Sequence, residues 1–170
     1  YHPVKNMTTG EGGAVLTNDK KIFDEIQMLR SHGTTKDQKL MLANDGPWYY
    51  EMKELGYNYR ITDIQCALGI SQLQKIDKFI KRKREIAKIY DVNFSNNINF
   101  SIPRAEKKSS HAYHLYPLQI NFDKLNISKK KLFEKMKKLN VNLQVHYIPI
   151  HLQPYYKKKY KFKNNNLENA

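Results

Sequence analysis

Apolar residues recur at helical spacing in three parts of the chain and predict three helices. The first follows Asn18-Asp19, a pair able to cap a helix, and stops at Ser31-His32-Gly33, where glycine can take a left-handed conformation. The second begins at Thr62-Asp63-Ile64-Gln65, which has the form of a capping box. Its apolar stripe continues to Ile89 and predicts one long helix of about 40 Å. The third helix follows Ser128, another capping residue.

Three other segments have the composition of strands. Residues 12–17 are predicted to form a short buried strand, and residues 114–122 and 141–150 predict two more. The order strand, helix, strand in the second half indicates a small α/β unit. Residues 34–59 are irregular and include Trp48, Tyr49 and Tyr50; a long aromatic loop of this kind is commonly functional or interfacial.

The best candidate for a domain boundary is the Asn- and Ser-rich stretch from Asn93 to Pro103, which is closed by a proline. We expect residues 1–92 to form one domain, with the long helix bridging to a second domain at 93–170. The 170-residue chain begins with Tyr1 inside a structured motif, and its polar end, 163–170, has the pattern of a helix cut near its start. We therefore expect a fragment of a longer protein.

The charge of the chain is strongly positive. Thirty Lys and Arg residues against sixteen Asp and Glu give +14, which attracts polyanions such as nucleic acids and nucleotide phosphates. The basic runs, at 81–84, 129–131, 135–138 and 157–159, lie mostly beside apolar residues at helical spacing. This arrangement favours solvated helix faces over a nucleic-acid surface.

Cysteine content and hydropathy indicate the compartment. The single cysteine, Cys66, lies in an apolar helical pattern and is predicted to be a buried thiol, which suits a reducing environment. No apolar run approaches the roughly 20 residues that span a bilayer, and no signal segment opens the chain. We predict a cytoplasmic protein with no metal site and no membrane or nucleic-acid partner.

The main candidate for chemistry is Lys5. It lies between an extended His2-Pro3-Val4 approach and a glycine-rich turn at 8–13. Such flanks can hold a lysine against an electrophile, as a nucleophilic amine requires. Spacing alone leaves open the alternative of a solvated surface lysine, the commoner environment of this residue. Glu11 in the turn and His32 beside Gly33 are expected to hold backbone geometry.

Four segments in order extend this argument: residues 1–5 with 9–13, 30–33, 57–60 and 144–151. Together they resemble the DegT/DnrJ family of nucleotide-sugar aminotransferases, which depend on pyridoxal 5'-phosphate (PLP). The resemblance is closest to the pseudaminic-acid branch of the family. It implies an α/β fold of the fold-type-I PLP-dependent transferase class, here incomplete. Residues 1–92 would be the end of the large PLP-binding domain, and 93–170 a truncated small C-terminal domain.

The resemblance also implies roles for residues of the first domain. Lys5 would form the internal aldimine with PLP and shuttle a proton between cofactor and substrate carbons; a related subgroup of dehydratases carries histidine there. Asn58 matches an asparagine that reaches the PLP phosphate from the neighbouring subunit, which implies a homodimer with a shared active site. Arg60 would either reinforce that phosphate site or pair with a carboxylate at the subunit interface.

Substrate-binding residues are implied in the second domain. Gln144, Val145, His146 and Tyr147 match a segment that lines the sugar-nucleotide site in the closest relatives. On a strand, alternation would direct Gln144 and His146 to one side and Tyr147 to the other. Without the resemblance, His146 would be interpreted as a structural histidine. His151 is a secondary candidate.

The implied reaction moves an amino group from L-glutamate to a 4-keto-6-deoxy UDP-N-acetylhexosamine in two ping-pong half-reactions. Several parts of the family's site are not in this sequence: a phosphate-binding serine that would precede Tyr1, a glycine-rich phosphate loop, an aromatic stacked on the pyridine ring, and the acidic partner of the ring nitrogen. Because the electron sink is weak without that acid, we predict that this chain alone is inactive. The alternatives are a non-catalytic regulatory relative of the same fold and a basic nucleic-acid-binding module.

Overall fold

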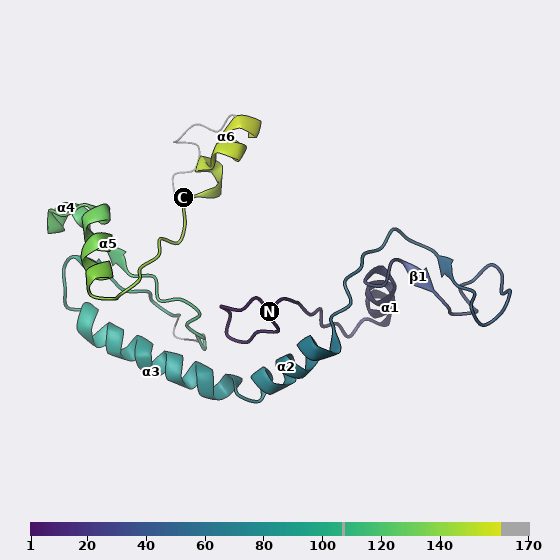
Figure 1. The fold of residues 1–170 in the computed structure, drawn as a ribbon. Helices are drawn as coiled ribbons and strands as arrows, with labels where there is room; N and C mark the ends of the chain where they lie inside the picture. Colours follow the sequence, from purple (N-terminus) through teal and green to yellow (C-terminus); the bar gives the residue numbers. More distant parts are fainter. Residues whose placement is uncertain (107, 161–170) are drawn as a thin grey trace. The chain divides into compact units, whose positions relative to one another are not determined.

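The computed structural model describes residues 1–106 and 108–160. They belong to two compact units, Tyr1–Arg84 and Glu85–Ala170, and the helices and strands of each are traced in Figure 1. The division falls inside helix α3 (Ile76–Phe94), and so does the boundary predicted at 92/93. The helix expected at 163–170 lies outside the described residues.

Helix α1 (Lys20–Leu29) confirms the first predicted helix, and its ends form as local chemistry dictates. The Asp19 side chain accepts hydrogen bonds from the backbone nitrogens of Lys21 (2.8 Å) and Ile22 (3.3 Å), satisfying donors that have no partner inside the helix. After the helix, His32 and Gly33 both take positive φ angles, of 67° and 68°. This turn reverses the chain towards the next strand.

The loop region 34–59 contains a small sheet that the sequence did not indicate. Strand β1 (Thr34–Thr35) pairs antiparallel with β2 (Glu51–Met52), and Figure 1 shows the hairpin beside α1. The backbone of Tyr57 ties the chain after β2 to the end of α1, since its nitrogen donates to the Leu29 oxygen at 2.7 Å. Two-residue strands carry little sequence pattern, so hydrogen bonding between distant segments decides their position.

A carboxylate fastens the loop between β1 and β2. The Oε1 of Glu51 accepts hydrogen bonds from the backbone nitrogens of Leu42 (2.7 Å) and Ala43 (3.0 Å) and from the Tyr49 hydroxyl (3.1 Å), while Oε2 pairs with Lys53. The Lys53 ammonium, with help from these donors, lowers the pKa of Glu51 to about 2. The same hydrogen bond to the carboxylate raises the pKa of Tyr49.

The predicted long helix is two helices, α2 (Asp63–Leu73) and α3 (Ile76–Phe94). The capping box at its start is confirmed: the Thr62 hydroxyl accepts from the Gln65 backbone, and the Gln65 side chain reaches back to Thr62. The prediction of one continuous helix is wrong. Its apolar stripe contains a five-residue step from Leu68 to Leu73, which departs from the helical period just before the break at residues 74–75.

Two further predictions for the first unit are wrong. Residues 12–17 form no strand, because no other segment in the described structure forms a β-ladder with them. Cys66 is exposed instead of buried, since it lies on a helix whose apolar residues, such as Ile64 and Ile70, are themselves exposed. Both errors share a cause: pairing and burial depend on a second surface that local sequence cannot supply.

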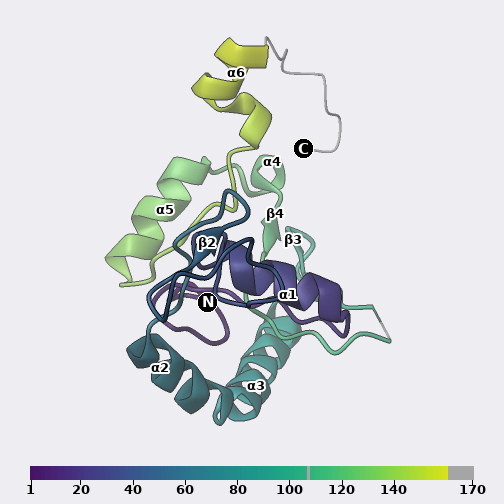
Figure 2. The ribbon, with the colours of Figure 1, turned by 90° about the vertical axis from the view of Figure 1, so that its right-hand side faces the viewer.

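The second unit combines another short hairpin with small helices. Strand β3 (Phe100–Ser101) pairs with β4 (Gln119–Ile120), and Figure 2 shows α4 (Phe122–Leu125) at the end of β4. The remaining elements are α5 (Lys129–Lys138), the 3-10 helix η1 (Ile150–Leu152) and α6 (Pro154–Tyr160). Ser128 caps α5 as predicted, accepting from the Lys131 nitrogen at 3.2 Å. The predicted strand at 114–122 shrinks to β4, and 141–150 forms no strand because it pairs with nothing described.

Aromatic rings join the end of α3 to this hairpin. Tyr90 packs edge-on against Tyr116 with ring centroids 5.1 Å apart, and Phe94 packs similarly against Phe100 at 5.4 Å. The Tyr116 hydroxyl donates to Asp91 at 2.7 Å; burial and this hydrogen bond raise the pKa of the phenol. Among the described residues, Ala87 is the only buried apolar side chain. Much apolar surface therefore faces outward in each unit.

Candidate functional site

Lys5 lies on a closed loop, residues 1–12, which we call the Lys5 loop. The amino nitrogen of Tyr1 donates to the Gly12 oxygen at 2.7 Å, and the Thr9 nitrogen donates to the Tyr1 oxygen at 3.1 Å, so the two ends of the loop meet. Between these ends, the backbone nitrogen of Lys5 donates to the backbone oxygen of His2 at 3.0 Å, and this hydrogen bond closes a turn. Lys5 is exposed on this turn.

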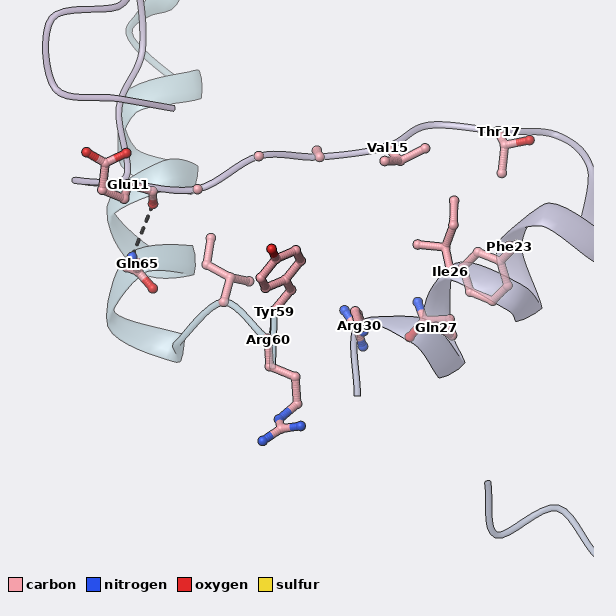
Figure 3. A pocket seen from close by; sticks show the side chains of 14 residues that line it. Glu11, Val15, Thr17, Phe23, Ile26, Gln27, Arg30, Tyr59, Arg60 and Gln65 are labelled. Carbon is pink, nitrogen blue, oxygen red and sulfur yellow. Dashed lines mark hydrogen bonds between the residues drawn. The ribbon is translucent and has the colours of Figure 1, made fainter. Parts of the chain in front are cut away.

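The base of the Lys5 loop is packed against α2. Thr9 is 4% exposed and lies against Gly69, while its hydroxyl donates to the Glu11 carbonyl oxygen. The same oxygen accepts from the Gln65 side-chain nitrogen at 3.1 Å, the contact drawn as a dashed line in Figure 3. Glu11 thus contributes to the loop through its backbone. The Lys5 loop is held to a helix instead of projecting freely.

An open cavity of about 760 Å³ lies beyond the loop within the first unit. It is bounded by the Glu11–Thr17 segment, the end of α1 and residues 59–61, and Figure 3 shows Tyr59 directed into the space between them. Its charged lining residues are Arg30, Arg60 and Glu11, although Figure 3 shows the Arg60 guanidinium and the Glu11 carboxylate directed away from the space around Tyr59. A net positive charge on the residues around a cavity of this volume favours an anionic ligand.

The structure does not gather the predicted cofactor residues in one cavity. Arg60 lines the cavity, but Lys5 and Asn58 are not among its lining residues. Asn58 forms an isolated antiparallel bridge with Ser31 and is exposed. Its neighbours Tyr57 and Tyr59 stack at 4.7 Å between ring centroids. Asn58 therefore lies on a surface segment that is hydrogen-bonded to the end of α1.

The predicted substrate residues belong to the second unit. Gln144, Val145, His146 and Tyr147 are all exposed and lie on an irregular segment with a bend at His146, not on a strand. Val145 lines an open groove of about 700 Å³ bounded by α5 and residues 141–145, whereas the other three do not. His151, the secondary candidate, is buried at 7% exposure on η1. A buried imidazole in a short helix is typical of a structural role.

The described residues contain neither a metal-binding cluster nor a membrane-spanning helix. Within residues 1–106 and 108–160, no group of three or more His, Cys, Asp or Glu side chains is arranged to hold a metal ion. Over the same ranges, none of the helices combines the length and the apolar character needed to cross a membrane.

The sequence did not reveal the contacts that hold the Lys5 loop. Gln65 was identified only as a capping residue, and Gly69 and Lys83 were not singled out. One signal was present: Gly69 follows Gln65 by four positions and so shares its helix face. A glycine beside a long amide on one face indicates a place where another backbone approaches closely.

Known proteins resemble the whole chain. Residues 1–170 match the DegT/DnrJ/EryC1/StrS aminotransferase family. An uncharacterized protein of Methanocaldococcus jannaschii is 45% identical over 170 residues, which are 100% of this chain and 44% of that protein. The UDP-4-amino-4,6-dideoxy-N-acetyl-beta-L-altrosamine transaminase of Campylobacter jejuni is 40% identical over 158 residues, covering 93% of this chain and 40% of the transaminase.

Solved structures agree with the sequence relatives. Helicobacter pylori PseC, an aminotransferase of pseudaminic acid biosynthesis, superposes with a TM-score of 0.79 at 32% identity, covering 93% of this chain and 40% of PseC. The PMP form of the sugar aminotransferase Spr1654 of Streptococcus pneumoniae gives 0.75 at 27% identity, covering 93% and 41%. The chain therefore has part of the fold-type-I transferase fold. It spans about two fifths of the length of these proteins.

Proposed function

The chain belongs to the DegT/DnrJ/EryC1/StrS aminotransferase family, and on that premise we propose that the whole protein is a PLP-dependent nucleotide-sugar aminotransferase. The proposed reaction takes an amino group from L-glutamate, releasing 2-oxoglutarate, and delivers it to a 4-keto-6-deoxy UDP-N-acetylhexosamine. The observation that carries the proposal is the Lys5 loop: a closed, anchored loop that presents one exposed lysine in a chain matching this family from end to end.

Lys5 fits the cofactor by its chemistry. PLP has an aldehyde, which a primary amine binds covalently, and when bound it supplies an electron sink for bond cleavage at the substrate's amino-bearing carbon. We assign two tasks to the Nζ of Lys5: to hold the cofactor between turnovers, and to carry the proton from the amino donor's α-carbon and later to the sugar's C4. The exposed position of Lys5 is compatible with both tasks.

Asn58 and Arg60 are proposed as phosphate ligands. An amide N–H donor and a guanidinium both suit a phosphate, and Arg60 already lines a cavity with Arg30. Asn58 is assigned to the phosphate of a neighbouring subunit, which makes the protein a homodimer with shared active sites. Exposed apolar side chains close to Asn58, such as Leu55 at 84% exposure, support an interface on this side of the first unit.

The second unit is proposed to contact the nucleotide sugar through Gln144, Val145, His146 and Tyr147. Their exposure suits contact with a polar ligand. In this proposal residues 1–92 are the end of the large domain and 93–170 belong to the small domain. The single cysteine and the nucleotide-sugar substrate together favour a reducing, cytoplasmic setting.

Covalent trapping tests the role of Lys5. Full-length protein is incubated with PLP, treated with borohydride and digested, and the modified lysine is identified by mass spectrometry. We expect the label on Lys5, loss of it in Lys5→Ala, and no change in Lys78→Ala, which removes an exposed lysine of α3. A label spread evenly over surface lysines would exclude the proposed role.

Activity tests the substrates. With L-glutamate and a 4-keto-6-deoxy UDP-N-acetylhexosamine, the full-length protein is expected to form 2-oxoglutarate and the amino sugar in equal amounts, and Lys5→Ala to form neither. Residues 1–170 alone are expected to show little turnover, because they lack the acid that would pair with the ring nitrogen. Rapid turnover by residues 1–170 would contradict that expectation. PLP binding without any amino transfer would favour the regulatory alternative.

A further inference from the structure

We propose that Gly69 on α2 and Lys83 on α3 are positioning residues for Lys5. Each fixes one part of the Lys5 loop, so that the amine is presented in one orientation. The inference rests on the proposed function of Lys5 and adds the residues through which the first unit controls it.

Gly69 allows the base of the Lys5 loop to pack closely against α2. Its position is buried, and a Cβ placed there would lie 3.0 Å from the Cγ2 of Thr9 and 3.9 Å from the Cε of Met7. The first distance is closer than ordinary van der Waals contact, so an added Cβ at 69 requires the Thr9 side chain to shift by a few tenths of an ångström and loosens the packing of the loop against the helix. Glycine is thus what allows Thr9 to be buried at 4% exposure.

Lys83 holds the part of the loop next to Lys5. Its Nζ donates to the Oδ1 of Asn6, and the pair is part-buried. A hydrogen bond from an ammonium is stronger than one between neutral groups, especially where water is partly excluded. Because Asn6 directly follows Lys5, this contact restrains the backbone from which the Lys5 side chain extends.

The two contacts act at different places. Gly69 and Gln65 of α2 hold the C-terminal part of the loop, at Thr9 and Glu11. Lys83 of α3 holds the turn at Asn6. Preorganising a reactive group in this way raises its rate by removing the need to order it during reaction. Losing the Lys83 contact leaves the base of the loop in place, so reactivity should fall while the fold persists.

Trapping kinetics provide the test. PLP condenses with a lysine amine with loss of water, and borohydride reduces the linkage to a secondary amine; mass spectrometry of the full-length protein gives the rate at Lys5 relative to other lysines. We expect Lys83→Met to lower this relative rate about tenfold, the effect of losing one charged hydrogen bond. Lys81→Met, an exposed lysine on the same helix, is the matched control and should have no effect. Lys83→Arg should retain most of the rate.

A double-mutant comparison separates positioning from general loss of charge. If Lys83 acts through Asn6, Asn6→Ala combined with Lys83→Met should be no slower than either single variant. Fully additive losses would overturn the inference, as would equal effects of Lys83→Met and Lys81→Met.

Amide hydrogen exchange gives a readout that does not need the cofactor. The rate of amide exchange at residues 5–9 should rise in Lys83→Met and in Gly69→Ala, while the circular dichroism spectrum stays the same. If the exchange rate does not rise, Gly69 and Lys83 do not hold the loop. If Lys5 in the unaltered protein is not labelled preferentially by PLP, the proposed function fails, and hydrogen exchange alone decides whether Gly69 and Lys83 hold the loop.

Discussion

Replacing Gly33 with alanine should destabilise the first unit by about 3 kcal/mol. Gly33 is buried at φ 68°, and a Cβ there would lie 1.8 Å from the backbone oxygen of Glu54. The positive φ costs an alanine about 1 kcal/mol. The overlap is with backbone, so it can be relieved only by moving residues 53–54. That movement breaks the hydrogen bonds from the Lys53 nitrogen (2.8 Å) and the Glu54 nitrogen (3.3 Å) to the Gly33 oxygen, at about 1 kcal/mol each.

Urea unfolding of the full-length protein, followed by circular dichroism, measures this loss. Gly13→Ala is the matched control, because a Cβ at Gly13 meets no heavy atom within 4 Å. Its free energy of unfolding should stay within about 0.5 kcal/mol of the unaltered protein. Should Gly33→Ala and Gly13→Ala differ by less than about 1 kcal/mol, the close backbone approach at Gly33 does not determine the stability of this unit.

Three further outcomes are expected. The pKa of Glu51, about 2 in the folded state against 4.5 ordinarily, means that this carboxylate stabilises the fold above pH 4.5 and loses its contribution as pH falls towards 2. The fluorescence of Trp48 should report a loop transition in that range, and Glu51→Gln should abolish its pH dependence. Thr62→Ala should cost about 1 kcal/mol of unfolding free energy and Thr62→Ser much less, because serine keeps the cap; equal losses would contradict the capping role. In alkaline titration Tyr116 should ionise after the exposed tyrosines, and Asp91→Asn should bring it closer to them, as ultraviolet difference spectra would show.

The helix caps and the turn at Gly33 could be predicted from the sequence, because they depend only on neighbouring residues. Asp19, Thr62 and Ser128 were identified as helix caps, and each accepts the predicted backbone hydrogen bonds, because a cap involves only residues two or three positions away. The turn at Gly33 was predicted for the same reason: its backbone conformation is a property of the residue itself.

Long-range pairing could not be predicted in the same way. Residues 12–17 and 141–150 have strand composition, but a strand exists only where another segment bonds to it, and the described structure offers none. The same distinction between local and long-range contacts applies to the candidate site. Sequence motifs predicted Lys5 and Arg60 as site residues. The contacts that hold the Lys5 loop come instead from Gln65 and Lys83, on helices far along the chain.

The attachment of Leu42 and Ala43 to Glu51 divides the connection between β1 and β2 into two independent spans. Residues 36–41 and 44–48 each begin and end at fixed points, so each closes as a short loop with its own small entropy cost. An insertion in one span keeps the attachment points of the other. This connection can therefore vary in length on either side of residues 42–43 while the hairpin beneath it keeps its register, which makes the two spans separate sites for grafting a new sequence.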